Sequence, residues 1–266
     1  MPRSLSELRN VLVDLDGVVY RGNLLLPGAA ELFEFFRSSG ISFAFATNNS
    51  TATPYQYMVK LRSLGIGVEE GLIFTAGQAV AHYLQKVAPA GAGVYIIGED
   101  GLVQPVLEAG YWIDKASPAF VLVGLDRQFT FAKLAEACVA IGKGAKLVAS
   151  NPDPNQPVET GLLPGSGALV AAISACSGAK PVVVGKPSPD MLLFAMNKLG
   201  FRKEVTAFLG DRLDTDVRAG KAARVTTILV LTGSTTPEDL HDSRLQPDFV
   251  FDDLVALRTA LEKAQK

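Results

Sequence analysis

The sequence predicts an α/β protein: a doubly wound, Rossmann-like parallel sheet with a second α/β domain inserted into it. Short runs of β-favouring apolar residues alternate with helical patterns along the 266 residues. These runs are apolar throughout rather than at every second position, which is typical of parallel strands covered by helices on both faces. With 48% hydrophobic residues, the chain is long enough to bury one large core or two modest ones.

The predicted core takes its elements from both ends of the chain. Apolar strands there precede helices with one apolar side, such as the phenylalanine-rich helix over 27–39, and Gly65 supplies a stop for the next helix. The expected strands cover 11–13, 41–46, 205–209, 227–231 and 249–251, and the expected helices cover 27–39, 53–64, 189–199 and 215–222.

The middle of the chain has an alternation of strands and helices of its own. The sequence therefore predicts a discontinuous core domain over 1–78 and 183–266, with an inserted domain over 79–182. We expect Tyr111 and Trp112 to anchor the core of the insert. Its expected strands cover 94–97, 120–123 and 147–149, and its expected helices cover 102–109, 131–141 and 168–175, after a leading helix near 78–86.

Composition and charge exclude several classes of partner. A formal net charge of −2 and a pI near 5.8 do not fit a nucleic-acid-binding protein, which usually has a basic patch. Glu7 and Arg9 interrupt any signal-peptide core, and Pro164 with several glycines interrupts the uncharged stretch 161–179, so we expect no membrane partner. The two cysteines have neither CxxC spacing nor the density of a disulfide scaffold, which favours a cytoplasmic location.

The sequence Asp14-Leu15-Asp16-Gly17 directly follows the first predicted strand. Residues two apart in an extended chain face the same side, so both carboxylates would project together. They would do so at the carboxyl end of a strand, where open α/β sheets bind their ligands. Two like charges that close are unfavourable unless a cation or a shared proton compensates. The motif points to catalysis or metal binding, although by itself it also fits a solvated acidic turn.

Three further polar segments follow strands or open helices of the predicted core. Each has an ordinary alternative: a helix cap for the first, a turn with a surface lysine for the second, and capping acids at a helix start for the third. Their occurrence together with the acidic motif, in this order, favours phosphate chemistry. The three segments are Thr47-Asn48-Asn49-Ser50, Gly185-Lys186-Pro187-Ser188-Pro189 and Gly210-Asp211-Arg212-Leu213-Asp214-Thr215-Asp216.

These four segments, with this spacing, resemble those of the haloacid dehalogenase-like hydrolase superfamily. They are most similar to the subfamily of NagD, 4-nitrophenylphosphatase and pyridoxal phosphate phosphatase, and the resemblance covers essentially the whole chain, including Asn151-Pro152-Asp153 in the insert. It implies a magnesium-dependent phosphatase that hydrolyses small phosphate monoesters through an aspartyl-phosphate. Sugar phosphates, nucleotides, pyridoxal phosphate and aryl phosphates are all candidate substrates.

The resemblance assigns roles to individual residues. Asp14 matches the nucleophile that attacks phosphorus, and Asp16 matches the general acid that protonates the leaving alcohol and later activates water. Thr47 matches a hydroxyl that hydrogen-bonds the phosphoryl group, and Asn48 and Asn49 match adjacent contacts to the substrate. Burial beside other carboxylates is expected to keep Asp16 protonated when the leaving group departs.

The remaining roles concern charge. Lys186 matches the cation that holds phosphate. The Mg²⁺ ligands would be Asp211, a carboxylate oxygen of Asp14 and the backbone carbonyl of Asp16, while Asp216 would support Lys186 or metal-bound waters. A carboxylate cannot approach a phosphate dianion unless charge is neutralised, and Mg²⁺ is a hard cation that takes oxygen ligands.

The sequence does not decide the roles of Asp214 and Arg212 or the oligomeric state. Asp214 fits a helix cap or a surface acid, and Arg212 fits a phosphate contact or a salt bridge equally well. The resemblance implies that the insert is a cap that closes over the site and sets specificity. By family analogy alone, the cap also offers a surface for a homodimer.

Two alternatives to hydrolysis remain open at this stage. Asp14 and Asp16 also suit a phosphotransferase or phosphomutase of the same superfamily, although the large insert argues against it. A non-catalytic phosphate-binding domain, such as a phospho-accepting receiver, would need a stable phospho-aspartate and no leaving-group acid at Asp16. The sequence does not identify the physiological substrate or the cap residues that contact the leaving group.

Overall fold

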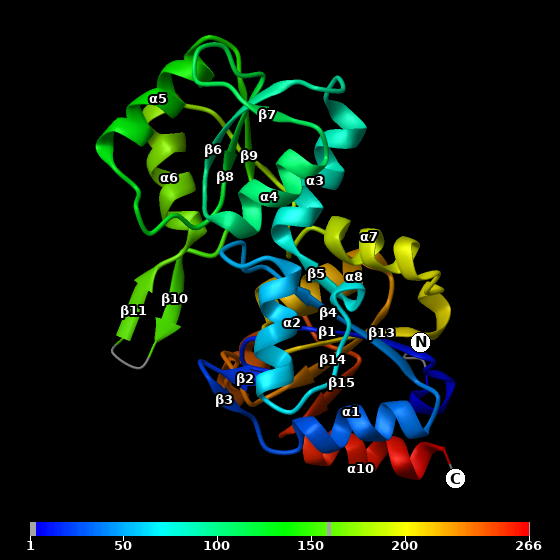
Figure 1. The fold of residues 1–266 in the computed structure, drawn as a ribbon. Helices are drawn as coiled ribbons and strands as arrows, with labels where there is room; N and C mark the ends of the chain where they lie inside the picture. Colours follow the sequence, from blue (N-terminus) through cyan, green and yellow to red (C-terminus); the bar gives the residue numbers. More distant parts are fainter. Residues whose placement is uncertain (1–3, 159–160, 266) are drawn as a thin grey trace. The chain divides into compact units, whose positions relative to one another are not determined.

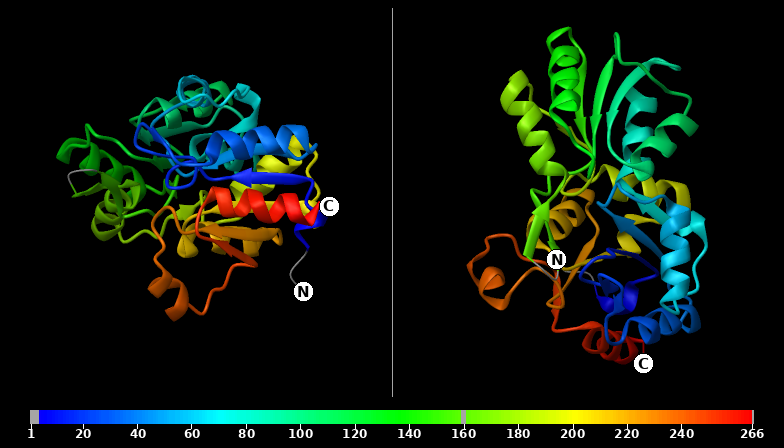
Figure 2. Two further views of the ribbon diagram at one scale, coloured as in Figure 1. Left: turned by 90° about the horizontal axis from the view of Figure 1, so that it is seen from below. Right: turned by 60° about the vertical axis from the view of Figure 1, so that its left-hand side comes forward.

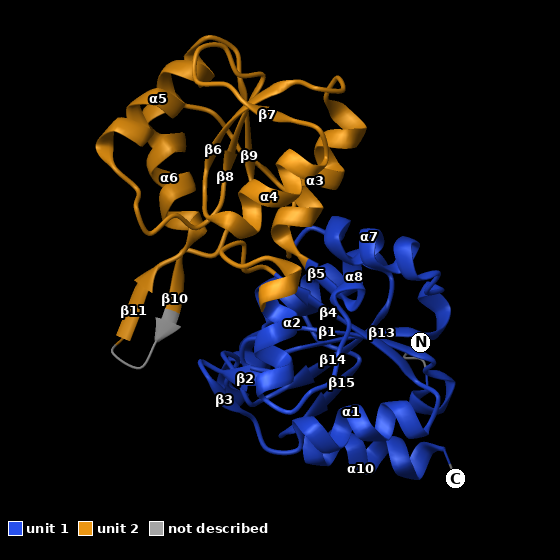
Figure 3. Ribbon diagram, in the orientation of Figure 1, with its two compact units in different colours: residues 1–47, 57–74, 187–266 blue, residues 48–56, 75–186 orange. Residues whose placement is uncertain are grey.

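The computed structural model describes residues 4–158 and 161–265, so 1–3, 159–160 and 266 of the predicted domains lie outside the described residues. The chain forms two compact units, which Figure 3 distinguishes by colour. The first unit comprises Met1–Thr47, Tyr57–Phe74 and Pro187–Lys266, and the second comprises Asn48–Gln56 and Thr75–Lys186.

These units differ from the predicted division for local reasons. The chain enters the second unit at Thr75 because Thr75 is the N-cap of α3 (Ala76–Val87), which packs within that unit. It leaves after Lys186 because β12 (Val182–Val183) pairs with a strand of the second unit. Residues 48–56 also group with the second unit, where the Ser50 hydroxyl accepts a hydrogen bond from the Leu125 N–H at 3.2 Å.

The first unit is built on a six-stranded sheet in the order β15-β14-β13-β1-β4-β5. β1 (Asn10–Val13) runs parallel to both neighbours, and its last residue lies opposite Phe45 of β4 and Leu209 of β13. The strand order changes direction beside β1, which makes its carboxyl end the switch point where such sheets bind ligands. The other strands are β4 (Ser42–Thr47), β5 (Ile73–Thr75), β13 (Thr206–Gly210), β14 (Thr226–Val230) and β15 (Phe249–Phe251).

Helices cover both faces of this sheet, as Figures 1 and 2 show. On one face α1 packs against α10, and on the other α7 packs against α8. The helices of the first unit are α1 (Ala29–Ser38), α7 (Asp190–Leu199), α8 (Arg218–Ala223), α9 (Pro237–Asp242) and α10 (Leu254–Ala264), while α2 (Pro54–Ser63) begins in residues grouped with the second unit.

A cluster of phenylalanine rings joins α1 to the sheet. Phe33 and Phe36 of α1 meet Phe43 and Phe45 of β4, with ring centroids between 4.9 and 6.0 Å apart. All four side chains are buried. Because aromatic side chains bury large apolar areas, this cluster fixes the helix on the strand that carries Thr47 at its end.

The second unit has a five-stranded parallel sheet in the order β12-β9-β8-β6-β7. α3 and α4 lie on one face and α5 and α6 on the other (Figure 1). Ile97, Val123 and Ile173 are fully buried in its core. The remaining elements are β6 (Gly93–Ile97), α4 (Asp100–Glu108), β7 (Trp112–Ile113), β8 (Phe120–Val123), α5 (Phe131–Gly142), β9 (Lys146–Ala149) and α6 (Ser166–Ser177).

The predicted α/β class is confirmed, and every predicted strand and helix is present, but some details are wrong or missing. Two antiparallel hairpins were not predicted: β2 (Tyr20–Arg21) with β3 (Leu24–Leu25), and β10 (Asn155–Val158) with β11 (Gly161–Pro164). Tyr111 is buried as expected, whereas Trp112 is 54% exposed on an edge strand. Among the described helices, none combines the length and apolar composition needed to cross a membrane.

The helix predicted over 215–222 starts in an unexpected way. A π-helical turn over Leu213–Val217 precedes α8, and the Val217 N–H donates to the Arg212 carbonyl at 3.0 Å. Such widened turns are rare and often occur at functional sites. Here the wide turn brings the Asp216 carboxylate back to the end of β13, where its Oδ2 accepts the backbone N–H of Asp211 at 3.1 Å.

Candidate active site

Three buried carboxylates meet at the carboxyl end of the sheet in the first unit. Asp14 directly follows β1, Asp211 directly follows β13, and Asp216 lies in the π-helical turn. One carboxylate oxygen from each lies within 4.8 Å of the others. All three residues are at least 93% buried, so the like charges are not relieved by water.

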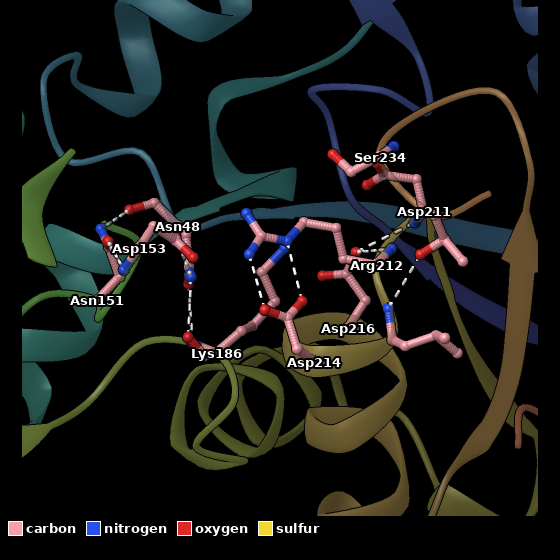
Figure 4. Close-up of polar contacts among 11 residues, drawn as sticks. Asn48, Asn151, Asp153, Lys186, Asp211, Arg212, Asp214, Asp216 and Ser234 are labelled. Atoms are coloured by element: carbon pink, nitrogen blue, oxygen red, sulfur yellow. Dashed lines mark hydrogen bonds and ion pairs between the residues drawn. The ribbon is translucent and has the colours of Figure 1, made fainter. Parts of the chain in front are cut away.

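Backbone groups hold this cluster in place, and Figure 4 shows those around Asp211 and Asp216. The Asp14 N–H donates to the Leu209 carbonyl at 2.8 Å, which extends the pairing of β1 with β13. The Oδ2 of Asp211 accepts the Ser234 N–H at 2.6 Å. The Oδ2 of Asp216 accepts the N–H of Asp211 and of Arg212, both at 3.1 Å. Charge-assisted bonds of this kind stabilise the ionised form of a carboxylate.

Two glycines allow the chain to approach Asp211 closely. A Cβ on Gly233 would lie 1.9 Å from the Asp211 Oδ2, and a Cβ on Gly17 would lie 2.7 Å from the same atom. Gly17 also has a φ of +84°, which residues with a side chain rarely adopt. The loop of Gly233 and Ser234 after β14 was not predicted as part of the site, although its small polar residues at a strand end are a signal for it.

The three carboxylates fit a divalent cation. They are hard oxygen donors, they converge, and their backbone partners use only one oxygen of Asp211 and of Asp216 in the contacts given above. The carboxylate of Asp16 is not part of this cluster among the described residues. The side chain of Asp216, expected only to support other groups, is therefore a candidate ligand itself.

Asp16 differs from its expected environment. It is exposed, so the expected burial of Asp16 is wrong in this structure. Asp16 begins a tight turn in which the Gly17 N–H donates to the Tyr20 carbonyl at 2.9 Å. Leu15 before this turn and Val18 within it are both buried, so Asp16 is exposed between buried neighbours.

Tyr57 and Lys60 of α2 were not predicted as site residues, yet the charge of Asp16 affects the pKa of both. Tyr57 is buried, and burial raises its pKa well above the usual value; the negative charge of Asp16 adds to this, while a hydrogen bond with Thr47 opposes it. The Lys60 ammonium lies 3.6 Å from the centroid of the Tyr20 ring, a cation–π contact. Partial burial lowers the pKa of Lys60, and the charge of Asp16 opposes that shift.

The structure decides the local roles of Arg212 and Asp214. Their side chains form an ion pair at 2.9 Å, and the Asp214 side chain is 64% exposed. Burial alone would raise the pKa of Asp214, but its hydrogen bonds and ion pair with Arg212 hold it below the usual range. Asp214 is therefore a surface acid, and Arg212 makes the salt bridge that the sequence left as one of two options.

Thr47 ends β4 in the first unit, whereas Asn48, Asn49 and Lys186 lie in the second. Lys186 is 2% exposed, and its N–H donates to the Asn48 Oδ1 at 2.8 Å. The Asn48 Nδ2 donates to the Lys186 carbonyl at 2.9 Å and to the Asp153 Oδ2 at 3.0 Å. The Asn49 Oδ1 accepts the N–H and the hydroxyl of Thr51 at 2.9 and 2.8 Å. Both asparagine side chains thus make contacts within the protein.

The chain matches two sequence profiles of a single superfamily. The profile described as haloacid dehalogenase-like hydrolase matches residues 11–112, and the profile described as HAD-hydrolase-like matches residues 183–257. Together these segments contain the carboxylate cluster, Thr47, Asn48 and Lys186.

Known phosphatases are similar to the chain over its whole length. An acid sugar phosphatase of Staphylococcus aureus is 37% identical over 260 residues, which are 97% of this chain and 100% of that protein. The crystal structure of a 4-nitrophenylphosphatase from Thermotoga maritima is similar with a TM-score of 0.92 and 38% identity, over 97% of this chain and 98% of the other. The crystal structure of a glycerol phosphate phosphatase from Mycobacterium tuberculosis, in complex with magnesium, is similar with a TM-score of 0.90 and 33% identity. The match covers 98% of this chain and 80% of the other.

Proposed function

Since this chain belongs to the haloacid dehalogenase-like hydrolase family and is a phosphatase of small phosphate esters, we propose that it works through an aspartyl-phosphate on Asp14. The observation that best supports this mechanism is the cluster of Asp14, Asp211 and Asp216, buried at the switch point of the sheet. Buried like charges at a ligand-binding edge are characteristic of a catalytic or metal site rather than of a folding core.

The proposed reaction has two covalent steps. A carboxylate oxygen of Asp14 forms a bond to phosphorus while the bond from phosphorus to the ester oxygen breaks, and the carboxyl proton of Asp16 goes to the leaving oxygen. Water then attacks the phosphorus, gives its proton to Asp16, and the bond from Asp14 to phosphorus breaks, which releases inorganic phosphate. Two such steps replace one difficult displacement. The exposure of Asp16 suits a group that meets both a leaving alcohol and water.

The chain would hold a divalent cation through Asp14, Asp211 and Asp216, and we propose that this cation is Mg²⁺ because all three donors are carboxylate oxygens. When bound, the cation neutralises charge on the phosphoryl oxygens and lets the nucleophile approach. Asp16 adds its backbone carbonyl to this ligand set in our proposal.

Positive charge and hydrogen bonds from the protein complete the proposed site. The match of Lys186 to the lysine of the family supports its role as the cation that binds the transferring phosphoryl group. The position of Thr47, the buried last residue of β4, supports its role as a hydroxyl donor to the same group. We propose that the second unit selects the leaving group, and that the substrate is a sugar phosphate or a similarly small ester.

The test is inorganic phosphate release from a panel of phosphate monoesters, with Mg²⁺ and with EDTA. We expect Mg²⁺-dependent release, and a loss of roughly 10³-fold or more in Asp14→Asn, because this change removes the nucleophilic charge but little volume. Asp114→Asn serves as the matched control, since Asp114 lies in a turn of the second unit.

Three other outcomes would contradict the proposal. Near-normal turnover by Asp14→Asn would exclude Asp14 as the nucleophile. Transfer of phosphate to an acceptor sugar without free phosphate would favour a phosphotransferase. A phospho-aspartate that stays stable for minutes would favour a receiver-like binding domain.

A further inference from the structure

The side chain of Asn48 joins two distant segments of the second unit. Its Oδ1 accepts the Lys186 N–H at 2.8 Å, and its Nδ2 donates to the Lys186 carbonyl at 2.9 Å. The two residues are 138 positions apart in the chain. The side-chain amide therefore pairs with both backbone groups of Lys186, much as a neighbouring strand would.

A second pair of residues holds Asn48 from the other side. The Asn151 Nδ2 donates to the Asn48 carbonyl at 2.7 Å, and the Asp153 Oδ2 accepts the Asn48 Nδ2 at 3.0 Å. Asn151 and Asp153 are themselves linked, because the Asp153 N–H donates to the Asn151 Oδ1 at 3.1 Å. Asn48 is thus held at its side chain and at its backbone by one turn, and both contacts can be followed in Figure 4.

The surroundings leave this network little freedom to move. Asn151 is 4% exposed, and its Nδ2 also approaches the Ser150 and Ser166 hydroxyls at 3.3 and 3.2 Å. A Cβ on Gly185 would lie 2.2 Å from the Ser150 carbonyl oxygen and 2.7 Å from the Asn48 Oδ1. Hydrogen-bonded polar networks of this kind rigidify the chain segments that they join.

We propose that Asn151 and Asp153 are positioning residues that fix Lys186 through Asn48, and so set how tightly the enzyme holds phosphate. The inference rests on the proposed function only in taking Lys186 as the phosphate-binding cation. A simple turn would need the bond between Asp153 and Asn151 alone. The bond from Asp153 to Asn48, across 105 positions of sequence, has no such local purpose.

Asp153 is the better residue to test, because Asp153→Ala and Asp153→Asn differ in whether the side chain can accept a hydrogen bond. Asp153→Ala removes the acceptor of the Asn48 Nδ2, so the backbone of Lys186 gains freedom and phosphate binds less tightly. We expect the KM and the inhibition constant of inorganic phosphate to rise about 10-fold, the size of one hydrogen bond. Asp153→Asn keeps an oxygen that can accept the same bond, so it should stay close to wild type.

The experiment measures KM, kcat, inhibition by inorganic phosphate and the thermal midpoint of the full chain. Asp114→Ala is the matched control, because Asp114 accepts two backbone N–H groups of its own turn at 2.8 and 3.1 Å in the same unit. Asn151→Ala removes the other contact to Asn48, and it keeps the test decisive if Asp153→Ala does not fold. Asp153→Ala is also made in an Asn48→Ala background, where the path to Lys186 is already broken.

The proposal is supported if Asp153→Ala and Asn151→Ala weaken phosphate binding about 10-fold, Asp153→Asn and Asp114→Ala do not, and Asp153→Ala adds nothing in the Asn48→Ala background. It is overturned if Asp153→Ala lowers only the thermal midpoint, or if its full effect persists without the Asn48 side chain. Calorimetric titration with inorganic phosphate decides the inference even if the wild-type protein hydrolyses no ester, an outcome that would defeat only the proposed function.

Discussion

The two units treat buried polar groups in opposite ways. The first unit gathers three carboxylates, Asp14, Asp211 and Asp216, and offers them backbone N–H groups. The second unit surrounds Asn151 with neutral partners, the Asn48 carbonyl and the Ser150 and Ser166 hydroxyls. The first site concentrates three carboxylates, whereas the second holds one carboxylate, Asp153, among neutral hydrogen-bond partners.

This difference indicates that one site binds a ligand and that the other rigidifies the chain. Buried like charges cost free energy unless a cation compensates them, so the carboxylate cluster is stabilised by a ligand from outside the chain. A hydrogen-bond network of mostly neutral groups needs no ligand and rigidifies the chain that it joins. The comparison implies that metal binding changes the stability and activity of the first unit. In the second unit, the loss of a single hydrogen bond should change stability.

The largest expected effect comes from removing one charge of the carboxylate cluster. Asp211→Asn keeps the size of the side chain but weakens the proposed cation site, so kcat/KM and metal affinity should fall by at least about 100-fold. Without metal, the same variant should be as stable as the wild type or more stable, because like-charge repulsion is relieved. Metal titration of activity and thermal melting with EDTA measure the two effects separately.

Asp214→Asn is the matched control, since Asp214 lies in the same segment but is 64% exposed. It should leave metal affinity unchanged. If Asp211→Asn bound metal as the wild type does, or lost stability in EDTA, the carboxylate cluster would be a structural feature and the comparison would fail.

Adding a charge in the second unit should lower folding stability, whereas removing one from the carboxylate cluster should not. Asn151→Asp places a charge among the neutral partners of Asn151 and replaces the Nδ2 donor with an acceptor. The Ser150 and Ser166 hydroxyls can rotate to donate to it, but the Asn48 carbonyl cannot, so the variant should lose about 2 kcal/mol of folding stability. Denaturant unfolding measures the loss, with the exposed Asn197→Asp as control. An Asn151→Asp variant of unchanged stability would show that the network is not held tightly.

Much of the fold could be predicted because its signals are local. The continuous apolar runs of β1, β4 and β13 and the residues directly after them specify the parallel sheet and the positions of Asp14 and Asp211. The exposure of Trp112 could not be predicted, because it depends on β7 being an edge strand, which is a property of the whole sheet.

The missing parts of the candidate site have the same explanation. Asp216 faces the cluster because of a π-helical turn that no periodicity indicates, and Ser234 reaches Asp211 because Gly17 and Gly233 leave room for the loop. The bond between Asn48 and Asp153 depends on segments 105 positions apart. Motifs identify which residues are present, whereas these contacts come from tertiary packing.

The smallest expected effect concerns a carboxylate of the first unit that the protein neutralises itself. The Asp248 Oδ1 accepts the Lys221 ammonium at 2.5 Å, and its Oδ2 accepts the N–H and the hydroxyl of Thr227, both at 2.8 Å. Burial alone would raise the pKa of Asp248, but these contacts hold it below the usual 3.8. This group therefore needs no metal, in contrast to the carboxylate cluster.

The pH dependence of Asp248→Asn follows from that lowered pKa. The ionised carboxylate stabilises the folded state fully above the pKa of the unfolded chain, and this contribution is lost as the pH falls through the folded pKa. At neutral pH the variant should be less stable by about 1 kcal/mol, a modest value because the ion pair is partly exposed and screened. Thermal melting from neutral to acidic pH should show this difference shrinking below pH about 4. A difference that stayed constant with pH would mean that Asp248 contributes through packing rather than through its charge.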